Sequence, residues 1–84
     1  MKISELLCDE SKWCKRHFAV DAQGNSISYN SVNAAKWCLG GALLKCELSL
    51  PKLEEIIGRS VVAFNDDPLT TFQDVREVIR KYEN

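Results

Sequence analysis

The 84-residue chain has room for one domain, so residues 1–84 are expected to form a single unit. Its content of 45% apolar and 27% charged residues is typical of a globular protein and excludes a disordered one. Eleven basic and twelve acidic residues give a net charge of −1, which argues against nucleic-acid binding through a basic face.

The sequence carries no sign of membrane insertion or export. No apolar run approaches the roughly 18 residues that a membrane helix needs, and acidic residues interrupt the short apolar stretch at the N-terminus, unlike a signal peptide. We therefore expect a cytoplasmic protein that does not bind membranes. Its cysteines should be reduced there: Cys8, Cys14, Cys38 and Cys46.

The first segment has apolar residues at helical spacing and allows two interpretations. One helix over 2–16 is the first, because the apolar stripe is continuous. We favour a break near Glu10, whose charge lies on that stripe, with Asp9 or Ser11 capping a second short helix. That helix would turn four side chains inward: Trp13, Cys14, His17 and Phe18.

A short β-hairpin-like segment is predicted near residues 18–28. Apolar and polar residues alternate on both sides of a turn that contains Gly24. Glycine at this place suits the positive φ of a hairpin turn. Two short strands are not stable alone, so we expect them to pack on the helices.

The stretch of residues 31–48 is predicted to be the central helix, with Asn30 or Ser31 as its N-cap. An α-helix turns by 100° per residue, and at this rotation the apolar residues fall on two sides of the helix. Both sides must therefore be covered by other protein segments. The Gly40–Gly41 pair costs roughly 1 kcal/mol per glycine relative to alanine, which a helix tolerates most easily where another backbone comes close. The main stripe comprises Val32, Ala35, Cys38, Leu39, Ala42, Leu43 and Cys46, and the second side Trp37, Leu44 and Leu48.

Two further helices have clear start and stop signals. Ser49 and Pro51 begin a helix that Gly58 ends. Thr71 with Asp74 three residues on has the form of a capping box before the last helix. Residues 61–64 could be a strand or a helical turn, and residues 65–68 read as a turn. The sequence thus predicts a mainly α, compact bundle of about four helices around the central helix.

Several of these motifs resemble a family of small bacterial and phage proteins of unknown function. Similar members carry W-C-x-x-G-A-L on a helix, matched here by residues 37–43, then an N-D pair, matched by Asn65–Asp66. A final helix opened by threonine with D-V matches Thr71 and residues 74–75. The match extends back to Trp13 and the turn around Gly24. The resemblance implies a shared fold, and no activity or cofactor comes with it.

Cys38 with His17 and Asn65 has the composition of a cysteine nucleophile, its base and an orienting amide. Nothing in the sequence shows that the three meet, and a cysteine on an apolar stripe is more often a core residue. The cysteine spacings lack the short C-x(2–4)-C knuckle of metal sites. We therefore expect no metal and no cofactor.

Asn65 and Asp66 precede a proline and another acid, a pattern that allows a cation site or a turn. We favour a structural turn in which one of these side chains ties the turn to a neighbouring helix end.

The leading functional hypothesis is a small non-enzymatic protein-binding module, because no coherent catalytic or metal constellation is present. One apolar side of the central helix would contact a protein partner or a second copy of the chain. Its binding residues would be Trp37, Gly40, Gly41, Leu44 and Leu48. From the resemblance, an inhibitor or modulator of a host system encoded by a phage or mobile element is its specific form. The alternative is a small enzyme or redox switch centred on Cys38.

Overall fold

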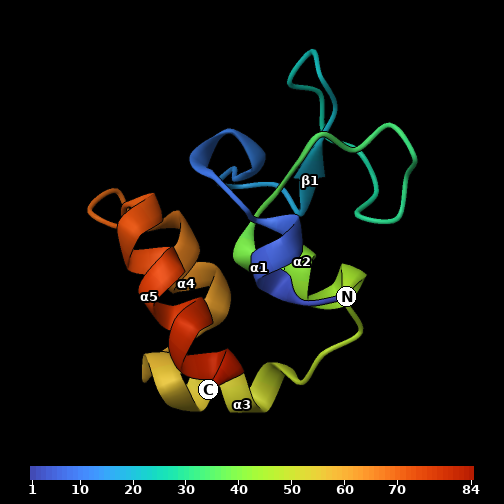
Figure 1. The fold of residues 1–84 in the computed structure, drawn as a ribbon. Helices are drawn as coiled ribbons and strands as arrows, with labels where there is room; N and C mark the ends of the chain where they lie inside the picture. Colours follow the sequence, from blue (N-terminus) through green and yellow to red (C-terminus); the bar gives the residue numbers. More distant parts are fainter.

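The computed structural model describes the whole chain, residues 1–84. Its mainly α fold with a short hairpin confirms the predicted fold class. Figure 1 shows the helices as one body, with two loops projecting from the end where β1 lies. In chain order the elements are α1 (Ile3–Leu6), the 3-10 turn η1 (Glu10–Lys12), β1 (Ala19–Val20), β2 (Lys36–Trp37), α2 (Leu39–Lys45), α3 (Leu50–Ile57), α4 (Val61–Asp66) and α5 (Phe72–Glu83).

The central helix is shorter than predicted. Helix α2 begins at Leu39 rather than near residue 31, and it ends at Lys45 rather than 48. Its N-cap is Cys38, so neither Asn30 nor Ser31 begins it. Helices α1 and α4 and strand β2 all pack against α2, whose first five residues are buried. The short helix is therefore enclosed by the rest of the chain.

Residues 31–38 are not helical because their backbone bonds to another segment. The amides of Ala35 and Cys38 donate to the carbonyl oxygens of Val20 and Phe18, at 2.8 and 3.2 Å. Val32, which fitted the helical stripe, is 98% exposed in a loop. An apolar residue at helical spacing does not distinguish a buried position from a lone exposed one.

The small sheet has one predicted turn and one partner that was not predicted. In the segment near 18–28, Val20 bridges Ser26 across a turn in which Gly24 has a φ of +87°. The main partner of β1 is β2, with Ala19 opposite Trp37. On its other side Trp37 forms a parallel bridge to Trp13, which joins the N-terminal segment to the sheet.

Helix α2 ends in a Schellman motif whose left-handed residue is not glycine. Glu47 has a φ of +56°, and its amide donates to the carbonyl oxygen of Leu44 at 3.1 Å. The amide of Leu48 donates to the carbonyl oxygen of Leu43, also at 3.1 Å. This pair of bonds satisfies the last carbonyl groups of the helix and turns the chain toward α3.

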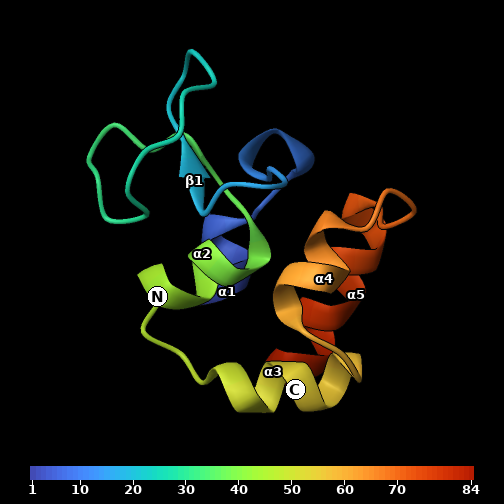
Figure 2. The ribbon, with the colours of Figure 1, turned by 180° about the vertical axis from the view of Figure 1, so that it is seen from behind.

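The other helix boundaries follow the sequence signals. The N-terminal segment breaks between α1 and η1, and Asp9 caps η1. Helix α3 begins after Ser49 and ends at Gly58, which has a φ of +82°. The capping box of Thr71 and Asp74 opens α5. Residues 61–64, which the sequence left open, are helical, and α4 continues through Asn65 and Asp66, so the turn predicted over 65–68 begins only at Asp67. Helix α4 packs against α2 and α3, and both views draw it between α2 and α5 (Figure 2).

One apolar core joins all these elements. It contains residues from both termini, the sheet and every α-helix. The two ends of the chain meet there, because α1 packs on α5 and the amide of Ser4 donates to Glu83 Oε2 at 3.1 Å. Its members are Ile3, Leu7, Ala19, Trp37, Leu39, Ala42, Leu43, Leu53, Val61, Phe72, Val75, Ile79 and Tyr82.

Candidate functional site

A small apolar cavity lies between the segment before β1, the start of α2, and α4. Its volume is about 110 Å³. Phe18 and Val62 are its large apolar side chains, and we call it the Phe18–Val62 cavity. The lining residues are Arg16, His17, Phe18, Cys38, Val62, Asn65 and Asp66.

Phe18 and Val62 are both half-exposed, at 51% and 55%. The sequence pattern predicted an inward Phe18 on a short helix, which is wrong because residues 15–18 form an irregular bend rather than a helix and β1 begins one residue later. The backbone of Phe18 is held in place, since its carbonyl oxygen accepts the amide of Cys38 and its atoms press against Gly41. The cavity is therefore bounded by large side chains on a fixed backbone.

Arg16 has an unusual backbone conformation at the rim of this cavity. Its φ is +73°, a region that costs a non-glycine residue roughly 1–2 kcal/mol. Its amide donates to Asp66 Oδ1 at 2.8 Å, which holds the turn. The guanidinium group makes no hydrogen bond or ion pair; the two ion pairs of the structure join Arg59 to Asp67 and Arg80 to Glu77.

Beneath the cavity, Asn65 is buried and its side-chain amide is fully used. Its Oδ1 accepts the indole N–H of Trp13 at 2.7 Å and the amide of Leu39 at 2.9 Å. Its Nδ2 donates to the carbonyl oxygen of Cys14 at 3.2 Å and to Asp66 Oδ1 at 3.0 Å. The side chain of Asn65 thus ties α4 to the beginning of α2.

The position of Asn65 follows from the parallel bridge between Trp13 and Trp37. The amide of Cys14 donates to the carbonyl oxygen of Trp37 at 3.1 Å. In a regular parallel ladder the next bond would run from the amide of Leu39 to the carbonyl oxygen of Cys14. The side-chain amide of Asn65 bonds to both groups instead and acts as an inserted peptide unit.

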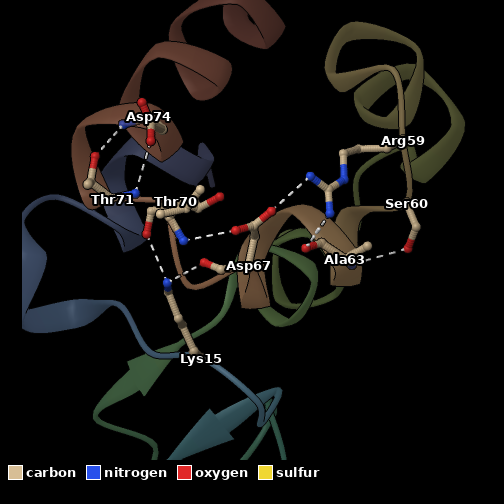
Figure 3. Close-up of polar contacts among 9 residues, drawn as sticks. Lys15, Arg59, Ser60, Ala63, Asp67, Thr70, Thr71 and Asp74 are labelled. Atoms are coloured by element: carbon tan, nitrogen blue, oxygen red, sulfur yellow. Dashed lines mark hydrogen bonds and ion pairs between the residues drawn. The ribbon is translucent and has the colours of Figure 1, made fainter.

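Lys15 reinforces the same junction from the outer side. Its ammonium group donates to the carbonyl oxygens of Asp67 and Thr70, at 2.7 and 2.8 Å (Figure 3). The turn between α4 and α5 is also held by the ion pair of Arg59 and Asp67. Lys15 is therefore occupied by backbone oxygens, in contrast to Arg16 beside it.

The cavity brings together Cys38, His17 and Asn65, the three residues of the cysteine hypothesis. Their geometry does not form a thiol–base pair, since no hydrogen bond joins His17 to Cys38. The Cys38 Sγ accepts the amide of Gly41 at 3.2 Å, and burial raises the pKa of the thiol above its usual range. A nucleophilic thiol needs the opposite shift. Cys38 contributes an apolar wall to the cavity.

The surface predicted on the central helix is not formed as one exposed face. Trp37, Gly40 and Gly41 are buried, and only Leu44 and Leu48 are exposed. The correction has a physical cause: the segment before β1 covers the glycine pair, and a Cβ at Gly41 would clash with the carbonyl group of Phe18. The close backbone approach expected at the pair is thus made by this chain itself. The indole of Trp37 is held by the carbonyl oxygen of Tyr29 at 3.1 Å.

No pattern in the sequence predicts that Arg16, Phe18 and Val62 lie close together. They lie on two segments far apart in the chain, and only the packing of α4 on α2 brings those segments together.

Two larger cavities lie along α5, of about 350 and 670 Å³. They adjoin at Cys8, Gln73 and Arg76, which line both, and their other walls carry side chains of both charges. No three histidine, cysteine or acidic side chains lie close enough together to hold a metal ion. None of the helices has both the length and the apolar character needed to cross a membrane.

Comparison with models of protein families, with curated proteins and with solved structures finds no match to this chain. The resemblance of its motifs to a family of small bacterial and phage proteins therefore stays a prediction.

Proposed function

We propose that this protein is a small non-enzymatic protein-binding module and that it contacts its partner through the Phe18–Val62 cavity. The observation that carries the proposal is the pair of half-exposed apolar side chains beside an apolar hollow. Protein interfaces concentrate their binding energy in such desolvated pockets, with aromatic and arginine side chains enriched among the important residues. Phe18 and Arg16 are residues of these two kinds.

The expected energy is sufficient for a specific contact. Complete burial of a phenylalanine or valine side chain contributes about 1.5–3 kcal/mol. Because Phe18 and Val62 are each about half covered already, covering the remainder would add about 1.5–3 kcal/mol in total. This corresponds to roughly a 10- to 150-fold change in the dissociation constant.

The specific form that we propose is a modulator or inhibitor of a host system, encoded by a phage or mobile element and acting in the cytoplasm. Support for this form comes from the resemblance of the W-C-x-x-G-A-L, N-D and T-x-x-D-V motifs alone. The alternative partner is a second copy of this chain, bound through the same cavity.

The test compares two matched variants in affinity enrichment from the cells that carry the gene, followed by titration of the enriched protein in purified form. In the first variant, which carries both Phe18→Ser and Val62→Ser, we expect the affinity to fall by at least roughly 10-fold. In the control, Val32→Ser, an equally apolar and more exposed side chain is removed from a distant loop, and the affinity should not change. Equal affinity of both variants would show that binding does not use the cavity.

The second candidate function is cysteine chemistry at Cys38, which is favoured by the presence of His17 in the same cavity. Alkylation of the native protein with iodoacetamide near neutral pH, read out by peptide mass spectrometry, separates it from the first. The exposed Cys8 serves as an internal reference. We expect Cys38 to react far more slowly than Cys8, because its thiol is buried and its pKa is raised. Faster reaction of Cys38 would favour the enzyme or redox switch instead.

A further inference from the structure

We propose that the Phe18–Val62 cavity binds one branched aliphatic side chain of a partner protein, and that an acidic side chain next to it in the partner's sequence pairs with Arg16. This inference rests on the proposed protein-binding function and specifies the chemistry of the partner. It follows from two properties of the site, the volume of the hollow and the charge at its rim.

The volume of the cavity selects the size of the side chain. An apolar cavity of about 150 Å³ in a protein core is large enough for a benzene molecule. At about 110 Å³, the Phe18–Val62 cavity suits a valine, leucine or isoleucine side chain and is too small for an indole ring. Its walls of phenyl, isopropyl and thiol groups offer such a side chain apolar contacts.

The charge at the rim selects the neighbouring group. Arg16 is exposed, and its guanidinium group lacks any hydrogen-bond or ion-pair partner in the chain. A guanidinium group binds a carboxylate through two parallel hydrogen bonds, which makes arginine well suited to this role. An aspartate or glutamate beside the aliphatic anchor would supply that carboxylate.

The other charged groups near Arg16 do not satisfy its side chain. Asp66 Oδ1 already accepts the amide of Arg16 and the side-chain amide of Asn65. The ammonium group of Lys15 is bonded to two backbone oxygens. The backbone amide of Arg16, bonded to Asp66, holds this residue at the rim in the left-handed conformation. The guanidinium group takes no part in that bond and is free to contact a partner.

The cavities along α5 offer a weaker case. Their walls carry basic and acidic side chains together, and Arg80 already pairs with Glu77. Nothing in them favours one kind of ligand.

The experiment uses short peptides titrated into the ¹⁵N-labelled protein and followed by NMR. The probe is acetyl-Gly-Leu-Asp-Gly-amide. Three matched peptides replace leucine with alanine, leucine with tryptophan, or aspartate with asparagine. For a fragment of this size we expect a dissociation constant on the order of millimolar for the probe. Amide shifts should be largest at Phe18, Cys38 and Val62, and each replacement should weaken binding by at least threefold.

Two protein variants test the pairing with Arg16. Arg16→Asn removes the charge and keeps a residue that tolerates the left-handed region. It should weaken binding of the probe by at least threefold and leave binding of the asparagine peptide unchanged. The control Lys12→Asn removes an exposed cation outside the cavity and should have no effect. An equal loss with both peptides, or in both variants, would overturn the pairing.

The failure of this inference differs from a failure of the proposed function. Suppose that no peptide shifts the cavity residues while the Phe18 and Val62 variant still loses its enriched partner. The cavity would then bind a protein of other chemistry, and only the inference would be wrong. If that variant also retains its partner, both proposals are wrong.

Discussion

Replacing Asn65 with alanine is expected to remove a large share of the stability of this fold. The substitution leaves three groups without a partner: the amide of Leu39, the indole N–H of Trp13 and the carbonyl oxygen of Cys14. A buried polar group that loses its partner costs about 1–3 kcal/mol. Taking values near the lower end, because the Trp13 side chain is only partly buried, the three groups together cost about 3–5 kcal/mol.

That loss is comparable with the whole stability of the domain. For a chain of this length the free energy of unfolding is about 4–12 kcal/mol. Urea unfolding followed by far-UV circular dichroism measures the difference directly, and the NMR signal of the Trp13 indole N–H reports the broken bond. The control is Asn33→Ala, since the exposed side chain of Asn33 makes no hydrogen bond and its removal should change stability by less than about 0.5 kcal/mol. A loss below about 1 kcal/mol for Asn65→Ala would refute the inserted-amide interpretation.

Three further predictions concern single positions. Gly40→Ala should stabilise the protein by up to about 1 kcal/mol, because the added Cβ would meet only ordinary van der Waals contacts. Gly41→Ala should destabilise it by about 2–3 kcal/mol, because the added Cβ would clash with the backbone of Phe18. Thermal unfolding measures both changes. Glu47→Gly should stabilise by about 0.5–1 kcal/mol, because glycine adopts the left-handed conformation of this Schellman motif without strain, and a higher urea midpoint at unchanged slope is the readout. Burial raises the pKa of Cys14 to about 11, so the folded state keeps a proton that the unfolded state loses as the pH rises. Because the thiol is only partly buried and solvent screens the effect, stability should fall by about 1–2 kcal/mol between about pH 9 and pH 11.

Each of these predictions has a result that contradicts it. The same sign of effect for both glycine substitutions would mean that the backbone contact at Gly41 is absent. A lower midpoint for Glu47→Gly would show that the glutamate side chain contributes more than the strain costs. For the pH effect, Cys14→Ala should flatten the slope, and an unchanged slope in this variant would assign the pH dependence to other groups.

The helices with local boundary signals could be predicted from the sequence. Helix α3 lies between Ser49 and Gly58, with Pro51 in its first turn and Gly58 in the left-handed conformation at its end. The side chains of Thr71 and Asp74 open α5 by bonding to the nearest backbone amides. The break after α1 is also local, since Asp9 caps the 3-10 turn that follows. These signals depend on a few neighbouring residues and require no knowledge of the rest of the fold.

The start of α2 and the candidate site could not be predicted in this way. Residues 31–38 have apolar residues at helical spacing, but hydrogen bonds to the distant segment around β1 determine their conformation. The same segment covers Gly41, which removes the predicted exposed face. The cavity depends on Phe18 and Val62 meeting, and periodicity along either segment contains no information about that contact.

The contact between α1 and α5 affects how the protein reaches its native state. The amide of Ser4 bonds to Glu83, and Ile3 is buried in the common core. During synthesis on the ribosome, α1 can contact α2 early, but its packing on α5 cannot form until the last turns of α5 have emerged from the exit tunnel. Closing so large a loop is slow, and mostly helical proteins owe their fast folding to short-range contacts. We therefore expect this chain to fold more slowly than a helical bundle of equal length with neighbouring partners.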